Sequence, residues 1–301
     1  MDNSKYGKVA VLFGGHSAER EVSLKSGAAV LSALQQQGVD AHKFDTADTP
    51  TETLKEYDRA FIVLHGRGGE DGVIQGALEQ LGIPYTGSGV LGSALGMDKI
   101  RTKRVWQGAQ LPTANYMTVT DENLNSVAAQ VGLPLMIKPA EEGSSIGMAK
   151  VESQQDLLDA WGVAKKYNSP VLAEAWIEGS EYTVAIVNGT AFPIIRLVTE
   201  NAFYDYDAKY QSNSTEYICP CGLSADVEKK YQDMALVAFS EVGALGWGRV
   251  DFMIDEQGKP WLLEVNTVPG MTDHSLVPMA AKAAGMTFEN LVLEILDTSL
   301  A

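Results

Sequence analysis

The stretch RVDFMIDEQGKPWLLEVN, residues 249–266, predicts a β-hairpin and decides how the C-terminal part of the chain folds. Two runs rich in apolar residues flank the turn residues EQGK (256–259), a pattern typical of paired antiparallel strands. Side chains alternate between the faces of a strand, so counting back from the turn fixes the register. The predicted opposed pairs are Asp255 with Pro260, Asp251 with Glu264, and Arg249 with Asn266.

One face of this hairpin predicts a metal site. Asp251 and Glu264 are opposed in the predicted register, and two opposed carboxylates repel each other unless a cation lies between them. Asn266 shares the face of Glu264, and two acids with an amide are ligands that Mg2+ accepts, with substrate phosphates completing the shell. The alternative is a solvent-exposed strand face. We favour the metal because the opposite face is apolar and predicted to be buried, through Val250, Phe252, Leu263 and Val265.

The length and charge of the chain limit the functions it can have. With 301 residues the chain exceeds the usual size of one core, so two or three domains are expected. Lys and Arg number 23 against 39 Asp and Glu, which gives a net charge of −16. An acidic protein of this kind is a poor partner for nucleic acid or for an anionic membrane. Local basic residues must therefore meet any anionic ligand.

The cysteines and the N-terminus predict a cytoplasmic protein. Cys219 and Cys221 stand one residue apart, so they make a poor disulfide and lack the spacing of a zinc site. We interpret both as structural. The N-terminal MDNSKYGKVAVLF contains only a short apolar run that fits a β-strand, and we find neither a signal peptide nor a membrane span.

The order of the predicted elements divides the chain into three parts of α/β and α+β class. Strands and helices alternate over the first ninety-odd residues, which predicts a Rossmann-like parallel sheet with helical crossovers. Antiparallel strands flanked by helices follow, and a polar loop, a long helix and the hairpin complete the chain. The predicted domains are an N-terminal substrate-binding domain (1–97), a small central domain (98–183) and a C-terminal catalytic domain with a lid loop (184–301).

The loop EEGSSIG (141–147), hereafter the glycine loop, is a candidate for phosphate binding. It closely follows Lys138, and the hydroxyl and amide groups of Ser144 and Ser145 are suited to donate to a phosphate. A plain hairpin turn is about as good an interpretation. The Walker sequence that opens a helix with GK[ST] is absent.

Two further loops follow predicted parallel strands, at the edge where such sheets bind ligands. In VLFGGHSAEREVS (11–23) a glycine pair suggests a phosphate site, but acids such as Glu19 would repel a phosphate. In HGRGGEDG (65–72), hereafter the histidine loop, His65 fits a ligand, a base or a turn residue, and we favour the turn residue.

Other polar residues are ambiguous by pattern alone. EAWIEGSE (174–181) offers two acids as acceptors for an adenine or a ribose, although solvated acids are the favoured interpretation. Lysines such as Lys99 are surface residues by default. The polar stretch 199–217 suits a loop that closes over a polar site, with packing as the alternative, because it contains Tyr204, Tyr206 and Tyr210.

Taken in order, eight motifs resemble the D-alanine–D-alanine ligases of the ATP-grasp superfamily. They are GGHSAEREVSLKSG, LHGRGGEDG, YTGSG, MDK, IKPAEEGSSIGM, FYDYDAKY, GWGRVDFM and LLEVNTVPGMTDHSLVP, and they span the chain from about Val9 to the last helix. The resemblance implies an ATP-grasp fold. It also implies a reaction in which ATP phosphorylates a first D-alanine, and the amine of a second attacks the acyl phosphate. The dipeptide serves peptidoglycan synthesis, and with it cell-wall biogenesis and cell shape.

The resemblance also implies roles for the residues that match the family by position. For ATP these are Lys99, Lys138, Ser144, Ser145, Glu174, Trp176, Ile177, Glu181 and Lys209. For two Mg2+ ions, with Mn2+ as a substitute, they are Asp251, Glu264 and Asn266. For the two D-alanines and the reaction they are Glu19, His65, Ser144, Tyr210, Arg249, Gly270, Ser275 and Leu276.

Some of these implied roles are specific. Glu19 would bind the first ammonium group and link through Ser144 to Tyr210, and Ser275 would bind the second carboxylate near a helix N-terminus, which favours an anion. Arg249 and the amide of Gly270 would face the oxyanion. His65 would lie beside the first substrate, and Lys209 would contact the transferring phosphate.

One departure from the family and two alternatives bear on the function. Many relatives have Lys where this chain has Ala175, so a side-chain donor to the adenine is missing. A ligase that makes an ester with D-lactate is an alternative, but such members tend to carry Phe in place of Tyr210. A catalytically silent nucleotide-binding module is the other, although GxGxxG is absent. The resemblance further suggests a homodimer formed through the N-terminal region.

Overall fold

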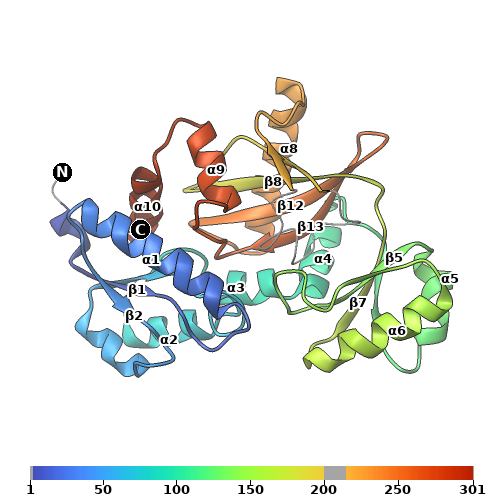
Figure 1. Cartoon of the computed structure of the whole chain (residues 1–301), viewed down its shortest axis with the longest axis horizontal. Helices are drawn as coiled ribbons and strands as arrows, with labels where there is room; N and C mark the ends of the chain where they lie inside the picture. The colour runs from blue at the N-terminus through green and yellow to red at the C-terminus, as the bar shows by residue number, and fades with distance from the viewer. Residues whose placement is uncertain (1–2, 200–214, 301) are drawn as a thin grey trace.

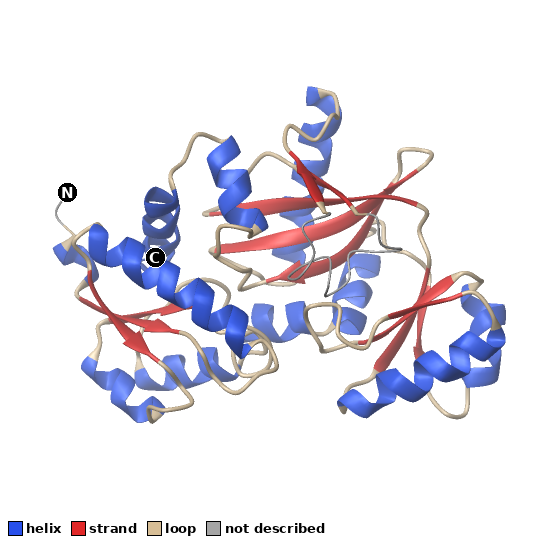
Figure 2. Cartoon of the chain, viewed as in Figure 1, coloured by secondary structure: helices blue, strands red, loops and turns tan. Residues whose placement is uncertain are grey.

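The structure is a computed structural model that describes residues 3–199 and 215–300. Three sheets form the described part of the chain, and each is packed against its own helices (Figures 1 and 2). The N-terminal sheet lies at one end of the molecule, the central sheet lies at the other end, and the largest sheet lies between them (Figure 1). The predicted lid residues lie outside the described residues: Tyr204, Tyr206, Lys209 and Tyr210.

The N-terminal sheet is parallel, as predicted. Strand β1 (Lys8–Leu12) pairs with both β2 (Asp40–Phe44) and β3 (Arg59–Ile62). Helix α1 (Arg20–Gln36) is the crossover from β1 to β2, and it buries Val30 among its apolar residues. The other elements here are the 3-10 helices η1 (Ser4–Tyr6) and η2 (Thr51–Glu56) and the helices α2 (Val73–Leu81) and α3 (Val90–Met97).

The central sheet is antiparallel, with the order β4-β7-β5-β6. Its strands are β4 (Tyr116–Val119), β5 (Leu135–Pro139), β6 (Ala149–Val151) and β7 (Val171–Ala175). Buried apolar side chains, including Trp161, join one face of the sheet to its helices. These helices are η3 (Leu124–Ser126), α5 (Val127–Val131), α6 (Gln154–Ala164) and η4 (Lys165–Tyr167).

The largest sheet runs in the order β11-β10-β8-β12-β13, with β9 paired to β8. Its strands are β8 (Gly179–Val187), β9 (Thr190–Ala191), β10 (Ile195–Val198), β11 (Glu216–Ile218), β12 (Trp247–Asp255) and β13 (Pro260–Asn266). The predicted domain boundary at 183/184 falls inside β8. The helices that accompany this sheet are α4 (Lys99–Gly108), α8 (Ala225–Glu241), α9 (Leu276–Ala283), α10 (Phe288–Asp297) and η5 (Thr298–Leu300).

The two ends of the chain share one hydrophobic core. Buried residues of the N-terminal sheet form a single cluster with those of α9 and α10, and α1 packs directly against α10. Arg59 reinforces the junction, because its guanidinium donates to the carbonyl of Tyr6 at 2.6 Å and to that of Ser299 at 2.9 Å. The smaller cavity described below therefore has walls from both ends of the sequence.

The hairpin register is confirmed where the predicted metal ligands lie and wrong near the turn. Asp251 is opposite Glu264, and Arg249 is opposite Asn266, as predicted. Pro260 is instead opposite Ile254, and a β-bulge between Asp251 and Phe252 restores the expected register farther from the turn.

The same bulge corrects the prediction for Leu263. A bulge adds one residue to one strand, which exchanges the faces of the side chains that follow it. Leu262, rather than Leu263, is therefore completely buried in the core with Val250, Phe252 and Val265. Leu263 instead lines the larger cavity described below.

No helix in residues 3–199 and 215–300 has the length and apolar character that crossing a membrane requires.

Candidate active site

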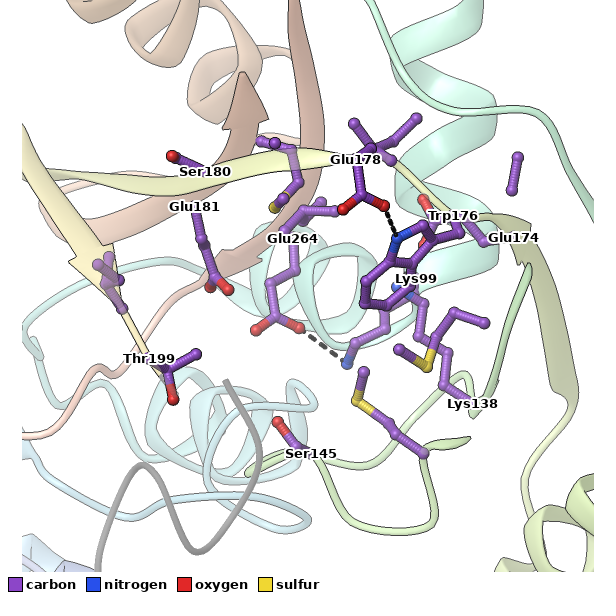
Figure 3. A pocket seen from close by; sticks show the side chains of 18 of the residues that line it. Lys99, Lys138, Ser145, Glu174, Trp176, Glu178, Ser180, Glu181, Thr199 and Glu264 are labelled. Atoms are coloured by element: carbon purple, nitrogen blue, oxygen red, sulfur yellow. Dashed lines mark hydrogen bonds and ion pairs between the residues drawn. The ribbon is translucent and has the colours of Figure 1, made fainter. Parts of the chain in front are cut away.

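A cavity of about 280 Å3, hereafter the larger cavity, lies between the central sheet and the largest sheet (Figure 3). Its volume is close to the lower end of the range for ligand pockets, roughly 300–1,000 Å3. Both sheets and the segment that joins β7 to β8 form its walls. The residues expected at ATP that line it are Lys99, Lys138, Ser145, Glu174, Trp176, Ile177 and Glu181.

Lys99 enters the larger cavity from the first turn of α4. Its ammonium lies 3.1 Å from Oε2 of Glu264 and donates to the carbonyl of Glu142 at 2.9 Å (Figure 3). Asp98 caps the helix by accepting from the amide of Arg101 at 2.9 Å, which fixes where α4 begins. The lysine, by default a surface residue, thus lies with its side chain only 9% exposed.

Glu174 sits on the wall of the larger cavity with its carboxylate between two lysines. Lys103 faces Oε1, and Lys138 faces Oε2. Burial acts to raise the pKa of Glu174, but the two lysines outweigh it, so the pKa lies below its usual value. Solvated acids were the favoured interpretation of this stretch by pattern, and that interpretation is wrong for Glu174, which is 3% exposed. Lys103 is an isolated lysine in the sequence, and no pattern there indicated that it is buried beside Glu174.

The segment after β7 forms the remaining wall with an aromatic side chain. Trp176 donates from Nε1 to Oε2 of Glu178 at 2.9 Å (Figure 3). The ammonium of Lys150 lies 4.8 Å from the centre of the Trp176 ring. Ala175, at the position where many relatives have lysine, also lines the larger cavity.

A second cavity of about 110 Å3, hereafter the smaller cavity, adjoins the first. Glu264 lines both cavities, and in the glycine loop Ser144 lines the smaller one while Ser145 lines the larger. The other residues expected at the substrates that line the smaller cavity are Glu19, His65, Arg249, Asn266, Gly270, Ser275 and Leu276.

Glu19 lies just before α1 and receives a hydrogen bond from the hydroxyl of Ser144. Two glycines from different loops make room for this carboxylate. A Cβ at Gly66 or at Gly143 would lie 2.7 Å from Oε2 of Glu19, so a side chain at either position would force this carboxylate to shift. Ser144 also has a φ of 51°, in the left-handed region that non-glycine residues rarely adopt and that is often found at functional sites. The contact predicted between Glu19 and Ser144 is therefore present.

The glycine pair before Glu19 is not an open phosphate site. The amide of Gly14 donates to the hydroxyl of Ser23 at 2.9 Å, and that of Gly15 donates to Asp45 at 3.0 Å. Arg20 in turn binds Asp45. The amides that a phosphate would need are thus used within the protein.

The predicted metal ligands are neighbours on the hairpin: Glu264 lines both cavities, Asn266 lines the smaller one, and Asp251 is opposite Glu264 and lines neither. Asp251, only 4% exposed, accepts two hydrogen bonds from Arg249, at 2.8 and 2.7 Å. It also accepts from Asn266 at 3.0 Å and from the hydroxyl of Thr183 at 2.6 Å. Two carboxylates and an amide oxygen are hard donors that suit Mg2+, so the residues fit the ion by chemistry. A metal that bound here would compete with the cations that now pair with these acids.

His65, which is buried, and Glu70, which is partly buried, line the smaller cavity side by side with Glu19. His65 donates from Nδ1 to the carbonyl of Val268 at 2.8 Å, and burial lowers its pKa, with Glu19 acting in the opposite direction. Glu70, which the sequence analysis did not single out, accepts from the amides of Gly66 at 2.7 Å and Val268 at 3.3 Å. Burial, with a smaller contribution from Glu19, raises the pKa of Glu70 to about 8. The one signal in the sequence that could have identified Glu70 as a site residue was its position in the histidine loop.

Ser275 occupies the N-cap position of α9, and its hydroxyl accepts from the amide of Thr272 at 2.9 Å. A Cβ at Gly270 would lie 2.9 Å from this hydroxyl, so the backbone at Gly270 approaches it closely. The helix N-terminus therefore opens into the smaller cavity with amide groups and a hydroxyl, a combination that favours an anion.

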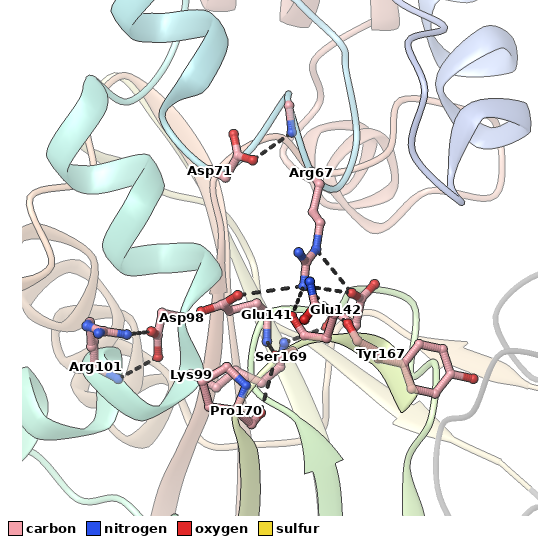
Figure 4. Close-up of polar contacts among 12 residues, drawn as sticks. Arg67, Asp71, Asp98, Lys99, Arg101, Glu141, Glu142, Tyr167, Ser169 and Pro170 are labelled. Carbon is pink, nitrogen blue, oxygen red and sulfur yellow. Dashed lines mark hydrogen bonds and ion pairs between the residues drawn. The ribbon is translucent and has the colours of Figure 1, made fainter. Parts of the chain in front are cut away.

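Arg67 joins the histidine loop to the central domain (Figure 4). Its guanidinium lies 3.1 Å from Glu142 and 3.6 Å from Glu141, the first two residues of the glycine loop. It also donates to the backbone carbonyls of Tyr167 and Asn168, at 3.5 and 3.4 Å. The two loops that enclose Glu19 are thus tied together.

Known proteins are similar to this chain over nearly its whole length. Residues 36–88 match the family described as "D-ala D-ala ligase N-terminus", and residues 105–297 match "D-ala D-ala ligase C-terminus". A D-alanine–D-alanine ligase from Acinetobacter baumannii is 59% identical over 304 aligned residues, which cover 100% of this chain and 99% of that protein.

Solved structures are similar over the same length. The D-alanine–D-alanine ligase of Bacillus anthracis has a TM-score of 0.87 and 34% identity, covering 97% of each chain. The same protein complexed with ATP has a TM-score of 0.83 and 30% identity, covering 98% of this chain and 97% of that one.

We predict that Glu70 makes stability depend on pH. Its carboxyl, near Glu19 and Lys99, keeps a proton up to about pH 8 in the folded protein but loses it near pH 4.3 in the unfolded chain. The unfolded state thus binds fewer protons between about pH 5 and 8, and the free energy of unfolding falls as pH rises. Urea unfolding of Glu70→Gln should lack this fall, which reaches at most about 1.4 kcal/mol per pH unit.

The exposed Glu52→Gln is the matched control and should follow the parent protein at every pH. Parallel pH profiles for the parent and Glu70→Gln would contradict a protonated Glu70.

Proposed function

Because the chain belongs to the family of D-alanine–D-alanine ligases, we infer that it joins two D-alanines in a reaction driven by ATP. The fold is that of the ATP-grasp ligases, as predicted. The protein is an ATP-dependent ligase, and its dipeptide product serves peptidoglycan synthesis. The D-lactate alternative is not favoured. The observation that carries the function is the pair of adjoining cavities with Glu264 in the wall of both.

We propose that the larger cavity binds ATP and the smaller one binds both D-alanines. Lys99 and Lys138 line this cavity and would hold the phosphates, and Ser145 would supply donors from the glycine loop. ATP transfers a phosphoryl group to the carboxylate of the first D-alanine at the junction of the cavities. The amine of the second D-alanine then attacks the acyl carbon, a peptide bond forms, and phosphate leaves.

We propose that Glu19 anchors the ammonium of the first D-alanine. The carboxylate opens into the smaller cavity and is held by Ser144, so it is oriented before the substrate arrives. Burial keeps the neighbouring His65 toward its neutral form, which avoids a competing positive charge beside the ammonium.

For the second substrate we propose that Ser275 and the amide of Leu276 bind the carboxylate at the start of α9. Arg249 and the amide of Gly270 lie across the smaller cavity and are suited to stabilise the oxyanion of the tetrahedral intermediate. The assignments of Lys209 to the transferring phosphate and of Tyr210 to the lid remain proposals from the family resemblance.

We propose that Asp251, Glu264 and Asn266 hold two Mg2+ ions, or Mn2+, when ATP is bound. The metal would neutralise charge on the phosphates. Before that, Arg249 and Lys99 pair with these two carboxylates and keep them from repelling each other.

The functions of the three domains, the location of the protein and its oligomeric state are also proposals. We assign substrate binding to residues 1–97, nucleotide binding to 98–183 and catalysis to 184–301. We also propose a cytoplasmic location and a homodimer formed through the N-terminal region. In support of the dimer, an apolar face joins α2, α3 and the loop before β12, and its exposed residues are Val73, Val90, Leu91 and Leu245.

Purified protein with ATP, Mg2+ and D-alanine should form ADP, phosphate and D-alanyl-D-alanine in equal amounts. Glu264→Gln removes the charge shared by both cavities and should lower turnover by roughly 100-fold or more, with a raised Mg2+ requirement for ATP binding. The control, Glu256→Gln, lies exposed in the turn of the same hairpin and should behave as the parent. Failure of the parent to release phosphate above the Glu264→Gln rate would reject the function.

Glu19→Gln tests the substrate anchor. The amide keeps an acceptor for Ser144 but loses the charge, so the KM for the first D-alanine should rise by roughly 10-fold or more. The Kd for ATP should stay within about two-fold of the parent value, as should both constants in Glu21→Gln, an exposed neighbour on α1. Unchanged affinity for the first D-alanine would remove Glu19 from this role.

Leu91→Asp tests the dimer surface. Light scattering should give a dimer for the parent and a monomer for the variant, because a charge in the middle of an apolar interface opposes association. Val163→Asp, at an exposed apolar residue of α6 in the central domain, should remain dimeric. A monomeric parent would refute the proposal.

A further inference from the structure

Lys103 is a completely buried lysine, with 0% of its surface exposed. It lines neither the larger nor the smaller cavity, so it has no direct access to a ligand in either. A buried ammonium without partners is strongly unfavourable, and lysine is among the residues least often found in cores. Its presence therefore requires a structural or functional reason.

The contacts of Lys103 point to Glu174. The ammonium forms an ion pair with Oε1 of Glu174, whose other oxygen faces Lys138. It also donates to the hydroxyl of Thr113 at 2.5 Å and lies 5.6 Å from the ring centre of Tyr116. Glu174 thus lies between one lysine that faces the larger cavity and one that does not.

Helix α4 carries Lys103 one turn beyond Lys99, so both lysines lie on the same side of the helix. Lys99 pairs with Glu264 on β13, and Lys103 pairs with Glu174 on β7. These two strands belong to the two sheets between which the larger cavity lies. The helix thus connects both walls of that cavity through two ion pairs.

The helix is itself fixed to the largest sheet and its helices. Trp106 donates from Nε1 to the carbonyl of Ala238 on α8 at 2.9 Å, and its side chain belongs to the core of that region. Thr113, after α4, donates to the carbonyl of Leu262 on β13 at 3.3 Å. Lys103 therefore reaches Glu174 from a rigid base.

We propose that Lys103 is a positioning residue for ATP. It pairs with one oxygen of Glu174, so that Glu174 does not fully neutralise Lys138, and Lys138 can still attract the phosphates. The proposal rests on the assignment of Lys138 to ATP. Two lysines and one glutamate carry a net charge of one positive, so Lys138 keeps attraction for an anion while it is paired. Without Lys103, Glu174 and Lys138 would form a neutral pair, and the ammonium would be drawn away from the cavity toward the carboxylate.

The pair with Glu174 also keeps Lys103 charged. Burial lowers the pKa of Lys103, and Glu174 provides the main opposing effect, while Lys138 adds to the lowering. Both lysines therefore depend on Glu174, which lies between them, and the effect of Lys103 on ATP passes through Glu174.

The test compares Lys103→Met, Glu174→Gln and the double variant in the full-length protein by calorimetric titration with Mg2+-ATP. Lys103→Met should raise the Kd for ATP by about 10-fold or more while the KM for D-alanine stays within about two-fold. If Lys103 acts through Glu174, adding Lys103→Met to Glu174→Gln should raise the Kd no further. Full additivity in the double variant would overturn the proposal.

Two controls separate positioning from folding and from the assignment of Lys138. Thr113→Val removes the hydroxyl but keeps the ion pair, so its Kd for ATP should match the parent value. A purely structural role for Lys103 would lower the melting temperature and the binding stoichiometry and leave the Kd of the folded fraction unchanged, and that result would refute positioning. If Lys138→Met binds ATP normally, the ATP assignment itself fails. If Lys138→Met weakens ATP binding and Lys103→Met does not, only the role of Lys103 fails.

Discussion

The active site depends on the pairing of buried cations with carboxylates. The chain is acidic overall, so the cations that attract an anionic nucleotide must be placed locally, and burying them unpaired would cost several kcal/mol each. The cations around the two cavities therefore lie against acids. The pairs are Lys99 with Glu264, Arg249 with Asp251, and Lys103 and Lys138 with Glu174.

This pairing explains how one set of residues can serve two states. Asp251 and Glu264 are opposed across the hairpin and would repel each other, yet Arg249 and Lys99 neutralise them. We propose that, when ATP binds, its phosphates pair with Lys99 and metal ions pair with Asp251 and Glu264. One balanced set of ion pairs then replaces another. Binding then avoids a step in which a buried charge stands alone, which would oppose association.

The sequence best predicted the features that depend on residues close together in the chain. The hairpin count placed Asp251 opposite Glu264 although its register at the turn was wrong by one residue, because the bulge next to Phe252 cancels that error. No residue pattern in the hairpin predicted the bulge or the burial of Leu262 in place of Leu263. The parallel N-terminal sheet followed from the element order. Lys103 could not be found in this way: its partner Glu174 lies on another element, and a lysine in a helix predicts only a solvated surface. Glu70 was missed partly for the same reason, because one of its two backbone partners, Val268, is distant in sequence, while the other, Gly66, belongs to its own loop.

The glycine loop is the element that makes the two cavities one site. Its residue Ser145 lines the larger cavity and Ser144 lines the smaller, while Arg67 ties the start of the loop to the histidine loop. Gly143 and Gly66 approach Glu19 from two different loops, so closely that a side chain at either position would displace the carboxylate. Any displacement of the glycine loop must therefore open both cavities and release Glu19 from Ser144. A first substrate bound to Glu19 would thus stabilise the loop position that the nucleotide at Ser145 requires, and the nucleotide would do the same for the substrate. The binding of the two ligands would then be coupled through direct contacts.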